Sequence, residues 1–137
     1  MQHQIPLQKG RPLAVVVADR CDHFRETLRR VLDQTSAAVT VHEAGTLRDA
    51  LRLVRGAGAD VVLLDVDLVM NQPASRLRRI VAAFPELKVI VMLNEDLAGY
   101  RLAIAQRWGY DCVAKEHAES ELPQLLDPGT RRSAVRA

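Results

Sequence analysis

Two continuous apolar runs constrain the fold of this chain more than any other feature of its sequence. They are Leu13–Ala18 and the stretch between Asp60 and Asp65, and both are rich in Val and Leu. A strand that is covered on both faces forms an unbroken apolar run, whereas a half-exposed strand alternates apolar and polar residues. The two runs therefore predict interior strands of a parallel sheet that is packed on both faces.

The rest of the chain supplies further strands and the helices between them. The segments 39–44, 88–93 and 111–114 predict three more strands. Apolar residues at helical spacing predict helices over His23–Gln34, 47–58, Ala74–Phe84, Leu97–Trp108 and Ser120–Leu126. Thr46 and Ser120 are expected to cap the second and last of these helices. Alternating strands and helices predict an α/β fold with a five-stranded parallel sheet and helices on both faces.

Length and composition limit the class of protein. A chain of 137 residues suits one domain, which we place at 13–126, after a disordered lead-in at 1–12 and before a basic flexible tail at 127–137. No apolar run reaches the roughly 18–20 residues of a membrane span. Cys21 and Cys112 form neither a disulfide framework nor a metal motif, which favours the cytoplasm. The arginines are scattered, which argues against direct nucleic-acid binding.

Three ionisable residues are expected to meet at one edge of this sheet. Asp19, Asp65 and Lys115 each fall at the end of a different predicted strand. In parallel sheets ligands bind beyond the carboxyl ends of the strands, at the point where the strand order reverses. The simpler alternatives are an aspartate that caps a turn and an ordinary exposed lysine. The convergence of all three residues favours a functional pocket.

Several motifs resemble the receiver domain of bacterial two-component response regulators. They are Val-Val-Val-Ala-Asp at 15–19 followed by Phe24-Arg25-Glu26, Asp-Val-Val-Leu-Leu-Asp-Val-Asp at 60–67, Phe-Pro-Glu-Leu-Lys-Val-Ile-Val at 84–91 and Val-Ala-Lys at 113–115. The resemblance covers about 13–126, and it implies the flavodoxin-like fold of that family.

The resemblance also implies roles for the residues at the sheet edge. It makes Asp65 the aspartate that a histidine kinase phosphorylates, and Lys115 the lysine that contacts the phosphoryl group. It assigns Asp19 and the backbone carbonyl of Asp67 to a Mg²⁺ ion, and the carboxylate of Asp65 can supply a further ligand. The family's second acidic residue after the first strand is replaced here by Arg20.

Two positions of the family's conformational switch are also altered. A Ser or Thr ends the fourth strand in the family, and this chain has Leu93. An aromatic residue precedes the lysine by three positions, and this chain has Cys112. Leu93 has no hydroxyl to bind a phosphoryl oxygen, and Cys112 has no ring to rotate. We therefore expect the usual coupling between phosphorylation and the protein surface to be weak.

Arg20 bears directly on the metal. Its positive charge would repel Mg²⁺ by several kcal/mol at about 5 Å and an effective dielectric near 20. One interpretation pairs Arg20 with Asp19 or Asp65 in a metal-free pocket. In the other, Arg20 points to solvent and Asp22 replaces the missing acid.

The function predicted is that of an atypical receiver domain in phosphorelay signalling, with Asp65 as phosphoacceptor. Its partners would be a sensor histidine kinase or phosphotransfer protein and a downstream protein, and it would catalyse at most its own phosphorylation and dephosphorylation. The alternatives are a receiver-like interaction or dimerisation module independent of phosphate, and a fragment of a DNA-binding transcriptional response regulator. An NAD- or flavin-binding enzyme is disfavoured because no Gly-rich phosphate loop is present.

An interaction surface is expected on the fourth predicted helix. Pro128 and Gly129 end the last helix early, which would leave apolar area uncovered beside Tyr100, Ile104 and Trp108. This surface predicts a homodimer or a docked partner.

Overall fold

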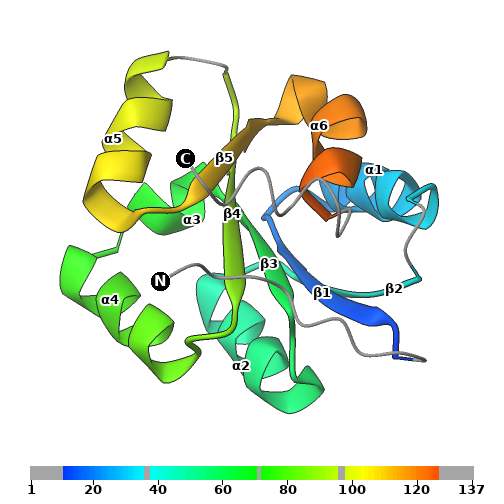
Figure 1. Cartoon of the computed structure of the whole chain (residues 1–137), viewed down its shortest axis with the longest axis horizontal. Coiled ribbons are helices and arrows are strands. Elements are labelled where there is room, and N and C mark those ends of the chain that lie inside the picture. Colours follow the sequence, from blue (N-terminus) through cyan, green and yellow to red (C-terminus); the bar gives the residue numbers. More distant parts are fainter. Residues whose placement is uncertain (1–10, 36–37, 71, 96–97, 127–137) are drawn as a thin grey trace.

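The sheet has the predicted architecture. The computed structural model describes residues 11–35, 38–70, 72–95 and 98–126. Five strands pair in parallel in the order β2-β1-β3-β4-β5 (Figure 1). Their bounds are β1 Leu13–Ala18, β2 Val39–Ala44, β3 Val61–Asp65, β4 Lys88–Leu93 and β5 Asp111–Ala114. The strands predicted from the sequence are confirmed, β3 beginning one residue later than expected.

The helices depart from the prediction at two places. Their bounds are α1 Asp22–Asp33, α2 Leu47–Ala57, α3 Val66–Met70, α4 Ala74–Ala83, α5 Ala98–Trp108, a 3₁₀ turn Lys115–His117 and α6 Ala118–Leu126. The short helix α3 has no counterpart among the predicted helices. The predicted cap at Ser120 is wrong: α6 continues from the 3₁₀ turn after β5, and the Ser120 hydroxyl lies inside the helix and donates to the carbonyl of His117.

The predicted ends of α2 are confirmed. Its first turn is capped by Thr46, whose hydroxyl oxygen accepts a hydrogen bond from the backbone N–H of Asp49 at 3.1 Å. Its last turn ends at Gly58, which adopts a left-handed conformation with φ of 62°. Glycine takes this conformation without the steric cost of a Cβ atom.

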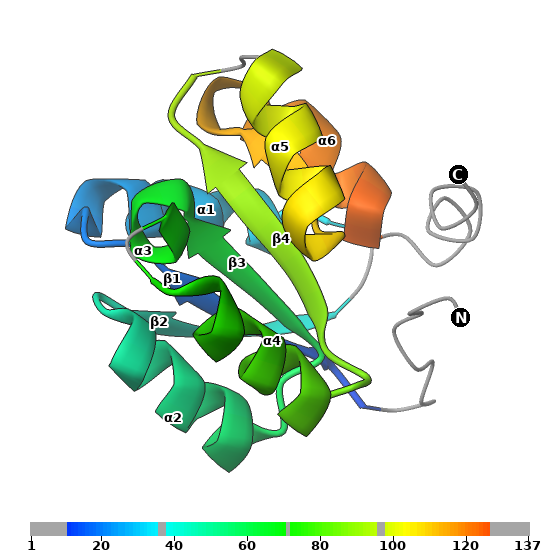
Figure 2. The ribbon, with the colours of Figure 1, turned by 90° about the vertical axis from the view of Figure 1, so that its left-hand side faces the viewer.

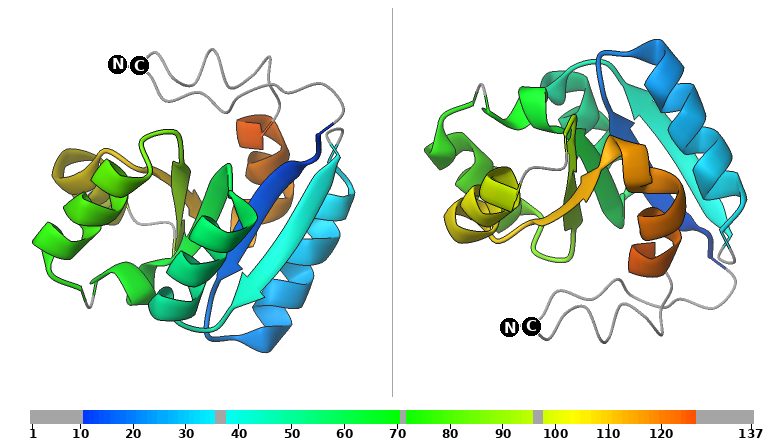
Figure 3. Two further views of the ribbon diagram at one scale, coloured as in Figure 1. Left: turned by 90° about the horizontal axis from the view of Figure 1, so that it is seen from below. Right: turned by 90° about the horizontal axis from the view of Figure 1, so that it is seen from above.

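Helices cover both faces of the sheet (Figures 2 and 3). Val15 and Val17 of β1 pack in a core with α1 and α6, while Val16 and Ala18 pack in a second core with α2, α3 and α5. Successive residues of β1 therefore face two different cores, and all four of them are buried. This double burial explains the continuous apolar run, since burying one such side chain contributes about 1.5–3 kcal/mol.

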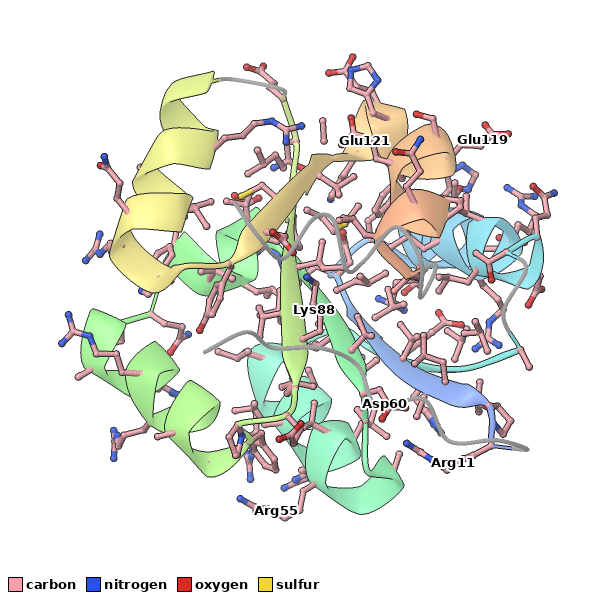
Figure 4. The ribbon with its side chains drawn as sticks, viewed as in Figure 1. Arg11, Arg55, Asp60, Lys88, Glu119 and Glu121 are labelled. Atoms are coloured by element: carbon pink, nitrogen blue, oxygen red, sulfur yellow. The ribbon has the colours of Figure 1, made fainter. Side chains whose placement is uncertain are left out.

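Charged pairs hold the amino ends of the strands, away from the carboxyl edge. Asp60 precedes β3 and is buried, and its carboxylate accepts hydrogen bonds from the Arg11 guanidinium at 2.8 Å and the Ala14 N–H at 2.9 Å (Figure 4). Lys88, the first residue of β4, pairs with Asp111, the first residue of β5. Arg11 belongs to the predicted lead-in, but it is anchored to the sheet through Asp60. Residues 1–10 and the predicted tail lie outside the described residues.

Within the described ranges, no helix combines the length and the apolar character that crossing a membrane requires.

Candidate functional site

The strand order reverses between β1 and β3, and the carboxyl edge at this point is the predicted pocket. The strand β1 lies between β2 and β3, so the chain leaves β1 toward β2 on one side and reaches β3 on the other. Asp19 follows β1 and Asp65 ends β3, and both residues are only 3% exposed. Lys115 follows β5, two strands away from β3.

Lys115 reaches across the end of β4 to both aspartates. Its Nζ atom lies 2.7 Å from Oδ2 of Asp19 and 3.1 Å from Oδ1 of Asp65. The ring of Phe24 lies below the same ammonium, with 4.6 Å between Nζ and the ring centroid. The structure therefore brings together the three residues that the sequence places at strand ends. Their chemical roles stay predictions.

Burial and charge oppose one another in this trio. Burial raises the pKa of Asp65 above its ordinary value, and the negative charges of Asp19 and Asp67 add to this effect against the lowering influence of Lys115. Burial alone would lower the pKa of Lys115, but hydrogen bonding and charge from Asp19 and Asp65 outweigh it and raise that pKa. The Lys115 amine is therefore firmly protonated, whereas keeping the Asp65 carboxyl group ionised costs free energy.

Two buried carboxylate oxygens of the pocket are in contact with the Lys115 ammonium. Oδ2 of Asp19 and Oδ1 of Asp65 are buried, and the Lys115 ammonium is the charged donor that reaches both of them. Buried carboxylate oxygens normally find such donors. Lys115 therefore occupies the oxygens that an incoming cation or reaction partner would contact.

The loop after β1 is fixed by Arg25. Its guanidinium donates to the backbone carbonyl of Asp19 and pairs with Asp22 and, at 3.1 Å, with Glu43. The N–H of Cys21 donates to Oδ1 of Asp19 at 2.8 Å, which orients this carboxylate inward. Asp22 is exposed and pairs with Arg25, and the interpretation in which Asp22 replaces the missing acid stays a prediction.

Arg20 lies at the mouth of the pocket and has a partner that the sequence did not predict. Its side chain is 68% exposed, and its Nη2 atom lies 3.9 Å from Oδ2 of Asp67. The amide of Asn94 approaches the same oxygen at 3.4 Å. The predicted pairing of Arg20 with Asp19 or Asp65 is therefore wrong in this conformation. Sequence reasoning missed Asn94, although it follows β4 and so falls on the same edge.

The two altered switch positions lie in the core on the α5 side of the sheet. Leu93 is fully buried among residues of α2, α3 and α5. Cys112 is half-buried against the same core, and this burial raises the pKa of its thiol to about 11. Both side chains pack as apolar groups and place neither a hydroxyl nor an aromatic ring beside the pocket.

The predicted interaction surface on α5 is only partly present. Ile104 is 1% exposed and packs in the core, so its assignment to this surface is wrong. Trp108 is half-buried and stacks on Tyr110 with 6.2 Å between ring centroids. The side chain of Tyr100 lies outside the described residues. Within the described ranges, the large apolar side chain that is exposed is that of Met70 in α3. The sequence analysis did not predict this exposure.

The donor set meets the minimum for Mg²⁺. This ion takes oxygen ligands in an octahedral shell, and one or two carboxylates plus waters commonly hold it. Asp19 and Asp65 supply two carboxylates, each of which has one oxygen in contact with the Lys115 ammonium. Within the described part of the chain, no group of three or more His, Cys, Asp or Glu side chains is arranged to hold a metal ion. The candidate protein ligands of a divalent ion are therefore the two carboxylates of Asp19 and Asp65, with the Lys115 ammonium between them.

The fold and the pocket define a class of small α/β domains that carry acidic residues at the carboxyl edge of a parallel sheet. The profile of the family described as "Response regulator receiver domain" matches residues 15–127. This chain belongs to that family, the receiver domains of two-component response regulators. The family and the fold predicted from the sequence are confirmed.

Curated relatives are transcriptional regulators of greater length. The "Uncharacterized transcriptional regulatory protein YxjL" of Bacillus subtilis (strain 168) is 23% identical over 123 residues, which are 90% of this chain and 56% of YxjL. The "Transcriptional regulatory protein DegU" of Brevibacillus brevis is 25% identical over 88 residues, or 64% of this chain and 37% of DegU. The chain thus spans about half of the first relative and less of the second.

Solved structures confirm the fold. The RcsB response regulator of Salmonella typhimurium superposes with a TM-score of 0.73 at 20% identity, covering 90% of this chain and 61% of RcsB. The receiver domain of the putative response regulator NarL from Mycobacterium tuberculosis gives 0.69 at 22% identity, covering 88% and 97%. A response regulator from Burkholderia pseudomallei gives 0.68 at 16% identity, covering 89% and 71%, and its structure holds a phosphorylated aspartic acid, a calcium ion and citrate.

Proposed function

We propose that this chain is an atypical receiver domain that accepts a phosphoryl group on Asp65. The donor would be a sensor histidine kinase or a phosphotransfer protein in the cytoplasm, and the output would be a contact with a downstream protein. The observation that carries the proposal is the burial of the Asp65 carboxylate at the sheet edge, in ion-pair contact with Lys115 and beside Asp19. Family membership supports the same role.

The reaction needs no proton transfer. A carboxylate oxygen of Asp65 attacks phosphorus, the new P–O bond forms, and the bond from phosphorus to the donor atom breaks as the leaving group takes the electron pair. The charge that builds on the phosphoryl oxygens must be neutralised. The Lys115 ammonium lies 3.1 Å from Oδ1 of Asp65, close enough to contribute this charge.

A divalent ion such as Mg²⁺ would be held by the carboxylates of Asp19 and Asp65. When bound, it supplies positive charge to the phosphoryl oxygens. Asp19 is oriented for this role by the Cys21 N–H, and Arg25 fixes its backbone. The positive charge of Arg20 at the mouth is expected to weaken the affinity for the ion.

Intact-protein mass spectrometry tests the proposal. The purified chain is incubated with acetyl phosphate and MgCl₂, and the wild type is expected to gain the mass of one phosphoryl group. Asp65→Asn should abolish the adduct. The matched control is Asp67→Asn, because Asp67 lies two residues further on and is partly exposed at the mouth. An unmodified wild type, with acetyl phosphate and with histidine kinases as donors, would refute the proposal, as would an adduct that persists in Asp65→Asn.

A second candidate function is a receiver-shaped interaction module that works without phosphate. The burial of Leu93 as an apolar core residue favours this candidate, because it leaves the end of β4 without the hydroxyl of the usual switch. A ligand shifts a conformational equilibrium only through its differential affinity for the two states. NMR spectra with beryllofluoride are expected to change near Asp65 and not at Trp108. Changes that reach Trp108 would contradict the phosphate-independent candidate.

A transcriptional output is a further candidate, because the curated relatives are transcriptional regulators of which this chain spans about half or less. Electrophoretic measurement of the native protein's size in its own cells tests it. A product of about 15.2 kDa would contradict a DNA-binding domain in the same polypeptide, whereas a product of roughly twice that size is expected for a two-domain regulator.

A further inference from the structure

We infer that Arg20 is a catalytic residue of this pocket, whose guanidinium binds the phosphoryl oxygens on Asp65 and allows phosphorylation without a divalent metal ion. This inference rests on the proposed function and concerns a residue that replaces an acid of the family pattern.

The pocket floor lacks positive charge for a phosphoryl group. Asp19 and Asp65 contribute two carboxylates, and Lys115 contributes one ammonium that is already shared between them. A phosphoryl group brings about −1.5 to −2 further charge. One more cation is therefore required, either from a metal ion or from the protein.

Among the described residues, Arg20 and Arg25 lie beside the pocket, and their side chains differ in how many partners hold them. Arg25 is 15% exposed and is committed to the Asp19 carbonyl, Asp22 and Glu43, which together fix the β1–α1 loop. Arg20 is 68% exposed, and its ion pair within the described residues is the long contact to Asp67. Exposed pairs of this kind contribute little to stability. Arg20 can therefore change partners at low cost.

The position of Arg20 suits this exchange. It directly follows Asp19, and its partner Asp67 lies in α3, two residues beyond Asp65, so the pair already links the loop after β1 to helix α3. A phosphoryl group on Asp65 carries more charge than the Asp67 carboxylate and offers three acceptor oxygens. A guanidinium binds such oxygens through two parallel N–H groups. Asn94 remains as a partner of Asp67 when Arg20 leaves.

The same charge makes Arg20 and a divalent ion competitors. A cation held by Asp19 and Asp65 is repelled by a guanidinium at the mouth, and each can neutralise the same phosphoryl oxygens. In the reaction, the Asp65 oxygen bonds to phosphorus as acetate leaves from acetyl phosphate with the electron pair. Arg20 and Lys115 stabilise the charge on the transferred group throughout, so EDTA should not stop the reaction.

The experiment measures the initial rate of phosphorylation by acetyl phosphate, by intact mass, in EDTA and in MgCl₂. For the wild type we expect rates within about threefold of each other under the two conditions. Arg20→Ala should lower the rate in EDTA by about tenfold or more, and Arg20→Lys should retain an intermediate rate because it keeps a point charge. Arg20→Asp should react only in MgCl₂. The control Arg30→Asp makes the same charge change at an exposed site in the last turn of α1 and should behave as the wild type.

The outcomes separate this inference from the proposed function. A wild type that is phosphorylated only with MgCl₂ refutes the role of Arg20 and leaves the role of Asp65 standing. A rate in EDTA that Arg20→Ala does not change also refutes it. The absence of any adduct under both conditions removes both proposals. Circular dichroism and thermal unfolding of each variant verify the fold, which an exposed substitution should preserve.

Discussion

Replacing Lys115 with Met should destabilise the protein by about 3–5 kcal/mol at neutral pH. At an effective dielectric near 20, the contacts of Nζ with Asp19 at 2.7 Å and Asp65 at 3.1 Å correspond to about 5–6 kcal/mol of direct attraction each. Most of this attraction is offset by the cost of removing the ammonium from water. Removing one partner of a buried pair nevertheless leaves the carboxylates uncompensated, which typically costs about 3–5 kcal/mol. Met keeps an unbranched apolar side chain against Phe24.

The destabilisation should depend on pH in a defined direction. Lys115 lowers the pKa of Asp65, so its removal raises that pKa further above the ordinary value. The folded state then holds a proton on Asp65 that the unfolded state has lost, and stability falls as pH rises from the ordinary pKa of Asp through the folded pKa. The penalty should therefore be smallest below about pH 4 and largest at neutral pH.

Urea unfolding followed by the fluorescence of Trp108, the single tryptophan, measures this free energy at several pH values. The double variant Lys115→Met with Asp65→Asn removes one of the two carboxylates and should recover about half of the loss. The control Lys88→Met breaks a pair whose partner, Asp111, is half-exposed and can be hydrated, so it should change stability by about 1 kcal/mol or less. A loss below about 1 kcal/mol in Lys115→Met, or one that is independent of pH, would refute the reasoning.

Three further measurements test other parts of the structure. Asp60→Ala should cost about 2–3 kcal/mol in urea unfolding, because it leaves the Ala14 N–H without its acceptor and removes the ion pair between Asp60 and Arg11; an unchanged midpoint would contradict this. Thr46→Ala should cost about 1 kcal/mol through loss of the α2 cap, and Thr46→Ser should restore most of it. A maleimide at pH 7.5 should label exposed Cys21 at least roughly tenfold faster than Cys112, whose pKa is raised to about 11 by burial; equal rates would show that Cys112 is accessible as a thiolate.

The convergence of Asp19, Asp65 and Lys115 could be predicted because it follows from local patterns and one topological rule. Each residue stands where an apolar run ends, and the carboxyl ends of parallel strands share one edge. The direction of the strands thus brings together residues that are far apart in the chain. No knowledge of side-chain conformation was required.

The side chains at the mouth could not be predicted in the same way. Arg20 has a long, exposed side chain with several carboxylates in reach, and its partner Asp67 depends on the helical path that α3 takes after β3. Helix α3 is only five residues long and directly follows a buried strand, so its apolar residues extend the strand pattern and conceal the change of structure. Ile104 looked available on α5 because helical spacing identifies an apolar stripe without showing what covers it.

The sequence by itself determined the strands, the approximate helices and the edge where the charged residues meet, since these depend on apolar periodicity and chain direction. Only the tertiary structure decided which charges form pairs: Lys115 between Asp19 and Asp65, Arg25 on the loop backbone, and Arg20 on Asp67. Backbone patterns arise from neighbours in the chain and from burial of whole segments. Ion pairs depend instead on differences of an ångström or two between side chains that only the folded packing brings together.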